Sequence, residues 1–305
     1  MKLFYAKLLL FGEYGLMFGA SALALPFLRH SGQLVLSGEG LLFSESRKSN
    51  LELERFISWF GHEKLNGRMN FPLDSQRLRT DVESGLFFRS GIPQEYGVGS
   101  SGALCAALFH EYSRYGDKVT QVARKHSLPE ALKHDFALME AYFHGRSSGL
   151  DPLVSFLNQP LLFNGDGKIS LPGLSTESFP FSVRLIDTGC TGATSPLVNL
   201  FHGKMEDTGF KEAFHRFYLP ANDGAVDAFL EGHTDKLFTH LRQITRFQLD
   251  YLSEMIPRPF REKMEDMLAH DIPVKLLGSG GGGYLLAFVP GQGDADLLPG
   301  AIQAF

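Results

Sequence analysis

The sequence predicts an α+β fold, because strand-like and helix-like segments are mixed without regular alternation. Two short apolar runs, residues 3–11 and 21–28, are typical of buried strands separated by a glycine-rich turn. Residues 102–115 and 129–144 place apolar side chains at three- and four-residue spacing, which predicts two helices. Strand-like runs return near the end of the chain, in PVKLLG and YLLAFV.

The segments between these runs carry weaker signals. We expect further strands at 32–45 and 82–88, a helix at 50–60, and strand followed by turn at 153–163. The sequence Asn-Gly-Asp-Gly at 164–167 predicts a tight turn.

A stretch rich in proline, serine and glycine, residues 171–180, is the best candidate for an interdomain link. It predicts two domains, residues 1–170 and 181–305. The second would begin with a strand at 181–187 and continue with helices between 195 and 270.

Composition restricts the class of protein. The chain has 305 residues, 44% of them hydrophobic and 21% charged, which is ordinary for a globular protein. Its net charge of −5 argues against a dedicated nucleic-acid binder. The two cysteines form neither a disulfide framework nor a metal motif, which fits a reducing cytoplasm. The apolar run at 8–27 is interrupted by Glu13 and several glycines, so we expect neither a signal peptide nor a membrane span.

The most informative segment is PQEYGVGSSGALCAALFHEYS, which begins at Pro93. Its glycines Gly97, Gly99 and Gly102 and its serines Ser100 and Ser101 lie at the start of a predicted helix. A helix start presents unpaired N–H groups and partial positive charge, and it therefore suits a phosphate. Paired hydroxyls could add a magnesium ligand. A loop with an ordinary serine helix cap is the alternative.

The pattern G-x-G-x-x-G occurs twice, at 97–102 and at 278–283. The dinucleotide-binding fingerprint needs a strand that leads directly into the glycines, and then a helix. Neither match has that context, so we reject a Rossmann interpretation. The second match holds five glycines in six residues, more than a hairpin connection needs, and it predicts a close backbone approach.

Three charged residues could carry chemistry. Glu140 lies inside a predicted helix, and Asp151 follows a Gly/Ser loop eleven residues later. If they converge, one could bind a metal while the other accepts a hydroxyl proton, as phosphoryl transfer requires. Lys7 lies in an apolar strand, where it could neutralise a phosphate or lower a neighbouring pKa. The alternatives are a surface charge for Glu140, a turn residue for Asp151 and surface exposure for Lys7.

In combination these segments resemble the GHMP kinase superfamily, which includes galactokinase, homoserine kinase, mevalonate kinase and phosphomevalonate kinase. Three segments match the family motifs in order: KLLLFGEYGLMFGASALALP, PQEYGVGSSGALCAA and KLLGSGGGGYLLAF. Two more resemble mevalonate kinases. FHGRSSGLDPLVS is similar to an H-G-x-x-S-G-x-D motif, and DTGCTGATSPLV is similar to an N-T-K-x-x-x-x-T motif.

The resemblance implies a two-domain fold, with an N-terminal mixed-sheet domain that binds ATP and a C-terminal ferredoxin-like α/β sandwich. The active site would lie in the cleft between them. Asp151 would act as the base with Lys7 beside it, and Ser101 and Glu140 would bind Mg²⁺. The ATP phosphates would be bound by Gly97, Gly99, Ser100, Ser101 and Gly102. The substrate side of the site would include Glu13, Tyr14, Thr194, Gly280, Gly281 and Gly282.

The implied activity is MgATP-dependent phosphorylation of a small hydroxy acid, with mevalonate as the expected acceptor, in isoprenoid precursor synthesis. Departures from the family leave the acceptor open: Tyr5-Ala6 replaces Pro-Gly, Tyr14 replaces a histidine, and Gly192 replaces a basic residue. Phosphomevalonate kinase, another GHMP kinase and a non-catalytic nucleotide-binding relative are the alternatives. We expect a cytoplasmic protein with a small-molecule substrate and no nucleic-acid or membrane partner. The resemblance is compatible with a homodimer.

Overall fold

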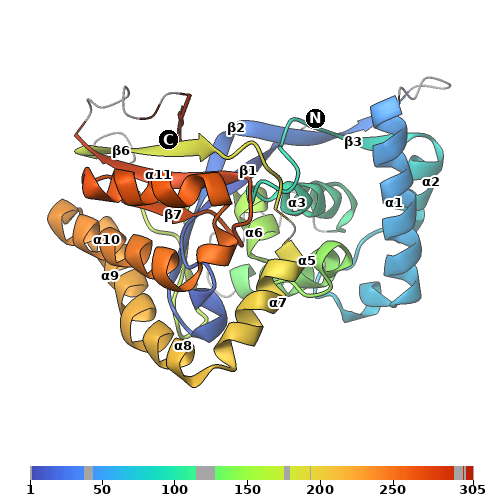
Figure 1. Ribbon diagram of the computed structural model, residues 1–305. Helices are drawn as coiled ribbons and strands as arrows, with labels where there is room; N and C mark the ends of the chain where they lie inside the picture. Colours follow the sequence, from blue (N-terminus) through green and yellow to red (C-terminus); the bar gives the residue numbers. More distant parts are fainter. Residues whose placement is uncertain are drawn as a thin grey trace. The chain divides into compact units, whose positions relative to one another are not determined.

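The structure is a computed structural model that describes residues 2–37, 44–114, 128–174, 179–192, 194–291, 298 and 300–304. At residues 44, 45, 128 and 194 it describes the backbone alone. The chain divides into two compact units, whose elements are labelled in Figure 1. Unit 1 comprises Met1–Lys7, Pro26–Pro93 and Gly99–Gln159; unit 2 comprises Leu8–Leu25, Gln94–Val98 and Pro160–Phe305.

Unit 1 is mainly helical. Its helices in the described residues are α1 (Ser44–His62), η2 (Leu65–Arg68), α2 (Ser75–Glu83), α3 (Ser100–Tyr112), α5 (Leu128–His144) and α6 (Leu150–Leu157). Strand β3 (Leu86–Ser90) pairs antiparallel with the second half of β2 (Ala22–Leu36), from Gly32 opposite Ser90 to Leu36 opposite Leu86.

Helix α3 forms the centre of unit 1. Every residue from Gly102 to Phe109 is buried, so this helix is apolar on all sides. It packs against α5 and α6, where the rings of Phe109, Phe136 and Phe156 lie with centroids 4.9–5.5 Å apart. A helix so completely enclosed holds its first turn in a fixed place.

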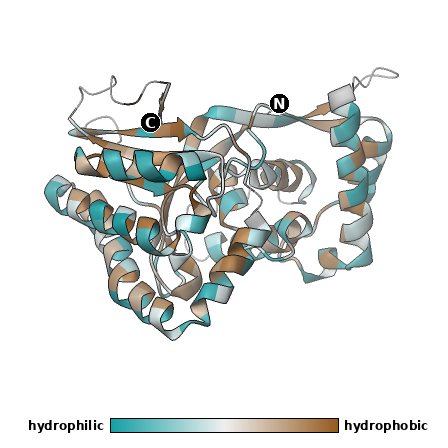
Figure 2. Ribbon diagram, in the orientation of Figure 1, coloured by the Kyte–Doolittle hydropathy of each residue, from teal (hydrophilic) through white to brown (hydrophobic). Residues whose placement is uncertain are grey.

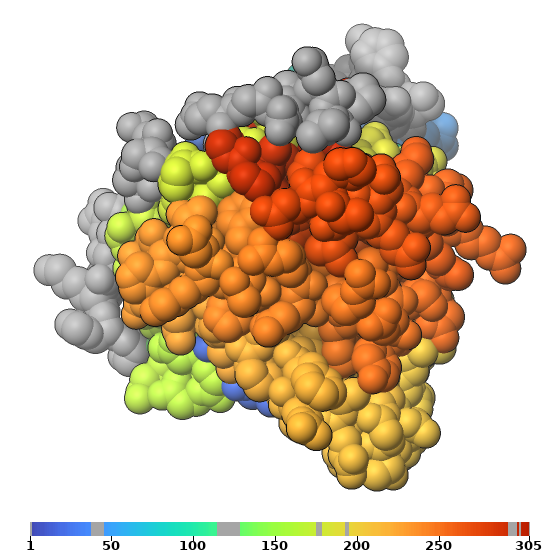
Figure 3. Space-filling model, turned by 60° about the vertical axis from the view of Figure 1, so that its left-hand side comes forward, coloured from blue at the N-terminus to red at the C-terminus, as the bar shows by residue number. Residues whose placement is uncertain are grey.

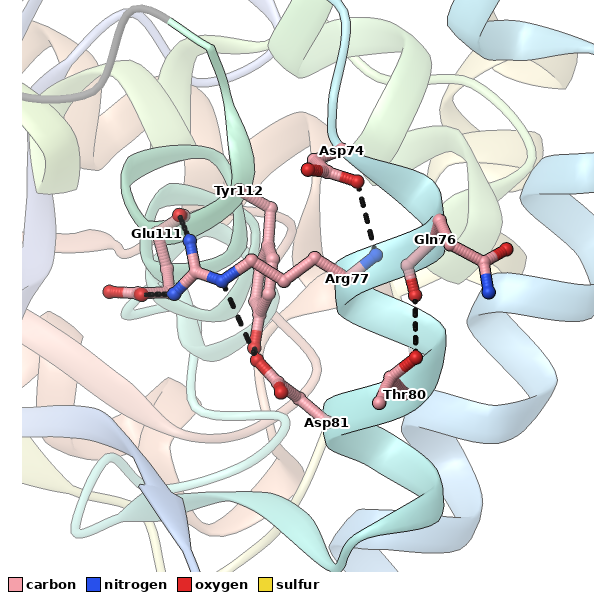
Figure 4. A network of polar contacts seen from close by, with 7 residues as sticks. All are labelled: Asp74, Gln76, Arg77, Thr80, Asp81, Glu111 and Tyr112. Carbon is pink, nitrogen blue, oxygen red and sulfur yellow. Dashed lines mark hydrogen bonds and ion pairs between the residues drawn. The ribbon is translucent and has the colours of Figure 1, made fainter.

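A polar cluster joins α2 to the end of α3 (Figure 4). Arg77 contacts the carboxylate of Glu111 and donates to the Glu111 carbonyl at 3.0 Å. Its guanidinium lies 5.0 Å from the ring centroid of Tyr112, whose hydroxyl donates to Asp81 at 2.8 Å. Asp74 caps α2 by accepting from the Arg77 N–H at 3.0 Å. The cluster fixes the far end of α3, away from its first turn.

Unit 2 contains a four-stranded antiparallel sheet in the order β7-β8-β6-β9. Its strands are β6 (Phe181–Asp187), β7 (Val274–Leu276), β8 (Tyr284–Pro290) and β9 (Ile302–Gln303). A second sheet has the order β1-β2-β4-β5, with β3 beside β2. It includes β1 (Phe4–Phe11), β4 (Leu161–Phe163) and β5 (Ile169–Ser170). The pairings of β2 with β4 and of β4 with β5 are antiparallel.

The helices of unit 2 in the described residues are η1 (Gly15–Phe18), α7 (Thr194–Met205), α8 (Thr208–Ala213), η4 (Phe214–Tyr218), α9 (Leu219–Leu230), α10 (Thr234–Tyr251), η5 (Ser253–Met255) and α11 (Arg258–Ala269). In α10 the buried residues recur at three- and four-residue spacing, and its ribbon alternates between teal and brown (Figure 2). The residues of α9, α10 and α11 form one continuous face in the space-filling view (Figure 3).

The α+β class is confirmed, and so are strands at Phe4–Phe11 and Phe181–Asp187 and the turn at 164–167. Three local predictions are confirmed only in part. Of the strand expected at 32–45, residues 32–36 belong to β2 and residues 38–43 lie outside the described residues, while helix α1 begins at Ser44. Of the strand expected at 82–88, residues 86–88 belong to β3, whereas the first two residues end helix α2. Of the strand and turn expected at 153–163, Leu161–Phe163 is strand β4, but the residues up to Leu157 are helix α6, because a short buried apolar run does not distinguish helix from strand.

The expected division into residues 1–170 and 181–305 stays a prediction. Part of the expected link, residues 175–178, lies outside the described residues. Within the described part of the chain, none of the helices has both the length and the apolar character that a membrane span requires.

Candidate active site

Two left-handed glycines lead into the first turn of α3. Gly97 and Gly99 have φ of +74° and +77°, a region that other residues rarely adopt. Gly99 is the N-cap of α3, and no side chain of the described residues caps this helix. A Cβ at Gly99 would lie 2.9 Å from Lys7 Cγ and 3.3 Å from Asp151 Oδ2. The missing side chain therefore lets α3 begin directly against these two charged residues.

Lys7 and Asp151 form an ion pair beside this turn. Lys7 Nζ lies 3.1 Å from Asp151 Oδ1, and the side chains are 5% and 29% exposed. Lys7 is buried, so the alternative of surface exposure for this residue is wrong. Asp151 lies in the first turn of α6. A Cβ at Gly102 would lie 2.8 Å from the Asp151 Cβ, so the first turns of α3 and α6 touch.

Glu140 is buried and accepts two hydroxyl hydrogen bonds, so the surface interpretation of this residue is wrong. Ser101 Oγ donates to Glu140 Oε1 at 3.2 Å, and Ser147 donates to Oε2. Burial and the nearby negative charge of Asp151 raise the pKa of Glu140 to about 8, while the two hydroxyl donors and Lys7 act in the opposite direction. Burial, together with the charge of Glu140, also raises the pKa of the Cys105 thiol.

Two contacts of this cluster were not predicted. Ser147 binds Glu140, whereas the motif match had singled out the next residue, Ser148, whose hydroxyl accepts from the Leu150 N–H at 3.3 Å. His144 Nε2 lies 3.1 Å from Ser101 Oγ, and partial burial lowers the pKa of this imidazole. A signal for both was present, because one helical turn separates Glu140 from His144 and a serine pair follows.

The donors around Glu140 suit a magnesium ion. Mg²⁺ prefers oxygen ligands and commonly takes only one or two carboxylates, completing its shell with water and substrate phosphates. The described residues hold no group of three or more His, Cys, Asp or Glu side chains that could bind a metal. A single buried carboxylate beside the Ser101 hydroxyl provides the smaller donor set that Mg²⁺ accepts.

In unit 2 the glycine-rich segment, Gly278–Gly283, is packed tightly against neighbouring backbone. A Cβ at Gly280 would lie 2.7 Å from the Met255 carbonyl oxygen, and one at Gly283 would lie 2.5 Å from the Tyr96 Cα. Gly281 N–H donates to the Met255 carbonyl at 2.6 Å. A Cβ at Gly282 would lie 2.6 Å from the Thr191 carbonyl carbon, so this position has no space for a side chain either. The predicted close backbone approach is confirmed.

Gly97 belongs to unit 2 and contacts the same segment. Its Cβ would lie 2.8 Å from the Leu277 carbonyl oxygen, one residue before the glycines. Gly283 N–H donates to the carbonyl of Cys190, an exposed cysteine, at 2.7 Å. The run also connects two antiparallel neighbours, β7 and β8. The glycines of this segment therefore serve both to connect β7 to β8 and to allow close packing against neighbouring backbone.

The turn after β1 carries two of the predicted residues, Glu13 and Tyr14. Glu13 is buried and bound to Lys275 Nζ. Tyr14 has φ of +57°, stacks on Phe201 with centroids 4.2 Å apart, and donates to the Ser279 carbonyl at 2.7 Å. Burial and the charge of Glu13 raise the pKa of the Tyr14 hydroxyl.

The remaining substrate-side residue, Thr194, is the first residue of α7, and its side chain lies outside the description. Lys275, the buried partner of Glu13, was not singled out by the sequence analysis. The signal that identified Lys7 was present here too, because Lys275 stands between the apolar residues Val274 and Leu276 of a buried strand.

Comparisons with known proteins cover nearly the whole chain. A mevalonate kinase of Pyrococcus abyssi is 24% identical over 313 residues, which is 94% of this chain and 88% of the relative. The structure of Leishmania major mevalonate kinase in complex with R-mevalonate covers 99% of this chain and 94% of its own, with a TM-score of 0.63 and 17% identity. The chain resembles the GHMP kinase superfamily in sequence and in fold.

A second solved GHMP kinase extends this likeness. Streptococcus pneumoniae phosphomevalonate kinase, in complex with phosphomevalonate and AMPPNP, covers 100% of this chain and 98% of its own at a TM-score of 0.64 and 14% identity. No family model matches the chain. The GHMP kinase fold is thus shared at low identity, while the expected mixed sheet and ferredoxin-like sandwich stay predictions.

Proposed function

We propose that this protein is a MgATP-dependent kinase that phosphorylates the hydroxyl group of a small hydroxy acid, with mevalonate as the acceptor. One observation carries the proposal: the Lys7–Asp151 ion pair lies at the uncapped first turn of α3, beside the buried Glu140 and its serine donors. Phosphoryl transfer needs this combination of anion site, metal ligand and base.

The first turn of α3 would bind the phosphates of ATP. Its N–H groups and the partial positive charge of the helix end attract anions, and Gly99 and Gly102 leave no side chain in the way. Ser100 and Ser101 would add hydroxyl donors, and the family resemblance assigns Gly97 to the same role.

Ser101 and Glu140 would hold Mg²⁺, which neutralises phosphate charge when bound. The burial that raises the pKa of Glu140 makes an unpaired carboxylate costly there, so a cation would favour its ionised form. Ser147 would keep the carboxylate oriented through its hydrogen bond to Oε2.

Asp151 would accept the proton of the acceptor hydroxyl as its oxygen forms the new bond to phosphorus. The phosphoryl group leaves ADP in the same event, and the proton passes from Asp151 to solvent, which its partly exposed side chain can reach. Lys7 would hold Asp151 in position through their ion pair. No covalent enzyme intermediate is required.

The acceptor is proposed from the relatives. The Pyrococcus relative is named a mevalonate kinase, and the Leishmania structure contains R-mevalonate. Phosphomevalonate is the second candidate, because the segments GEY and GSSGA of this chain are closer to phosphomevalonate kinases and the Streptococcus structure contains that compound. Glu13, Tyr14, Thr194 and Gly280–Gly282 remain predicted contributors on the substrate side.

The test is ADP formation by the purified protein with MgATP and mevalonate, phosphomevalonate, homoserine or galactose. We expect turnover with mevalonate, with the phosphorylated product identified by mass spectrometry. Turnover with phosphomevalonate alone would select the second candidate. Nucleotide binding without turnover on any acceptor would exclude the kinase and select a non-catalytic relative. The cytoplasmic location and the homodimer stay predictions.

A further inference from the structure

A second ion pair with a buried lysine in the described residues, Glu13 with Lys275, carries out no step of the chemistry proposed above. The side chains of Glu13 and Lys275 are 0% and 1% exposed, and the ammonium group contacts Glu13 Oε1. Removing two charges from water costs about as much as their attraction returns, so such a pair is weak evidence for stability. Its placement points to another role.

The lysine end of the pair holds Leu276, two residues before the glycine-rich segment. Lys275 Nζ also donates to the Leu276 carbonyl at 2.9 Å. Gln248, fully buried in α10, accepts from the Leu276 N–H at 2.8 Å. Both peptide groups of Leu276 are therefore bound by buried side chains at the point where β7 ends (Figure 1).

The glutamate end holds the turn between β1 and η1. The Glu13 carbonyl accepts from the buried Tyr218 hydroxyl at 3.0 Å. Gly12 precedes this residue with φ of +112°, and Tyr14 follows it with φ of +57°. A positive φ at a residue other than glycine, as at Tyr14, persists only where the surroundings hold it. The Tyr14 hydroxyl then returns to the glycine-rich segment, at the Ser279 carbonyl.

We propose that Glu13 and Lys275 are positioning residues that lock the glycine-rich segment to the β1 turn, so that Gly280–Gly282 are held in place for phosphoryl transfer. The inference rests on the proposed function for its catalytic part. Its mechanical part concerns unit 2 alone. The hydrogen bond from the Tyr14 hydroxyl to the Ser279 carbonyl is a second contact between the β1 turn and the same segment, one residue after Gly278.

A double-mutant cycle separates positioning from charge compensation. Glu13→Met and Lys275→Met each leave one uncompensated charge buried, so each should lower the melting temperature. The double variant has no buried charge left, and its melting temperature should return close to that of the wild type. If the pair positions the segment, kcat of the double variant stays reduced, by on the order of 10²-fold, because the Leu276 carbonyl has lost its Lys275 donor.

Hydrogen exchange provides a readout that does not need activity. The Gly281 and Gly283 N–H groups donate to the carbonyls of Met255 and Cys190, so their exchange reports directly on the packing of the segment. We expect faster exchange there in the double variant than in the wild type at equal melting temperature. Arg242→Met is the matched control, since it removes an exposed ion pair with Asp271 in the same unit and should change neither exchange nor kcat.

Recovery of both kcat and slow exchange in the stable double variant would overturn the proposal, since the pair would then only compensate charge. If the double variant does not regain stability, Tyr14→Phe provides the second test, because it removes only the bond to Ser279 and should also speed exchange of the segment. Unchanged exchange there would likewise overturn the proposal. A wild type without turnover would reject the proposed function and leave the exchange test in force.

Discussion

The described part of the chain contains two buried lysines that each pair with a carboxylate, and the surroundings of the two pairs differ. Lys7 in unit 1 meets Asp151, whose side chain keeps 29% of its surface exposed. Lys275 in unit 2 meets Glu13, which is sealed from water. An open carboxylate can exchange its proton with a ligand or with solvent, whereas a sealed one can only hold its neighbours. A lysine–carboxylate pair can therefore take part in proton transfer in one place and hold neighbouring segments in position in another.

The largest effect is expected at the open pair. Asp151→Asn should lower kcat on the order of 10²-fold or more, while ATP binding stays intact, because the amide cannot accept the hydroxyl proton. Kinetics with mevalonate and nucleotide titration would measure both. Asp166→Asn is the control, since this carboxylate lies in an exposed turn beside Lys168. Near-normal turnover of Asp151→Asn would remove the residue from its proposed role.

The two lysines should differ in their contribution to stability. Lys275→Met leaves Glu13 buried and should lower the free energy of unfolding by about 3–5 kcal/mol. Lys7→Met should cost less, because water can reach the Asp151 carboxylate, yet it should affect kcat more than stability. Chemical denaturation of both variants measures the difference. Equal losses of stability would contradict the distinction between an open and a sealed pair.

The raised pKa of Glu140 predicts that the stability of the protein depends on pH. The folded-state pKa of Glu140 is raised to about 8 from an ordinary value of 4.5, so the folded protein binds a proton there more tightly than the unfolded chain. This contribution is complete below pH 4.5 and is lost as pH rises toward 8. Without metal, stability should therefore fall over this range more steeply than in Glu140→Gln, as melting temperatures would show.

Adding Mg²⁺ to the same stability measurement tests whether Glu140 binds the metal. Because a cation favours the ionised carboxylate, Mg²⁺ with nucleotide should restore the stability of the wild type at pH 8 but not that of Glu140→Gln. An equal response of the two proteins would indicate that the metal binds elsewhere.

A smaller effect is expected for Gly99→Ala in comparison with Gly145→Ala. The two glycines have similar φ values, +77° and +73°, so each substitution introduces about 1–2 kcal/mol of backbone strain. Only at Gly99 does the new Cβ meet Lys7 and Asp151; at Gly145 nothing lies within 4 Å. We expect the first variant to lose more stability and activity than the second. Similar kinetics in both would show that the contact is unimportant.

The smallest effect concerns the polar cluster at the other end of α3. Arg77→Ala should lower the free energy of unfolding by about 1 kcal/mol or less, because the pair with Glu111 is exposed. Steady-state kinetics should not change. A large loss of kcat would mean that the far end of α3 is coupled to its first turn.

Sequence reasoning singled out Lys7, Glu140 and Asp151, which the structure brings together, because the signals of these residues are local. Lys7 stands out in an apolar strand, and Glu140 and Asp151 lie in one motif. Ser147 and Lys275 were missed, since their partners depend on side-chain direction and on a contact across 262 residues. Helix α6 was mistaken for strand because its packing on α3 and α5, which no local pattern records, decides its conformation.

The contrast between the two cysteines has a practical consequence. Cys105 is enclosed in α3 with its thiol pKa raised, so it resists alkylation, whereas Cys190 is exposed next to the glycine-rich segment. These are the two cysteines of the chain. A maleimide dye or spin label added to the native protein should therefore attach at Cys190 alone. The wild-type chain thus carries its own single labelling position, from which the motion of the segment can be followed spectroscopically.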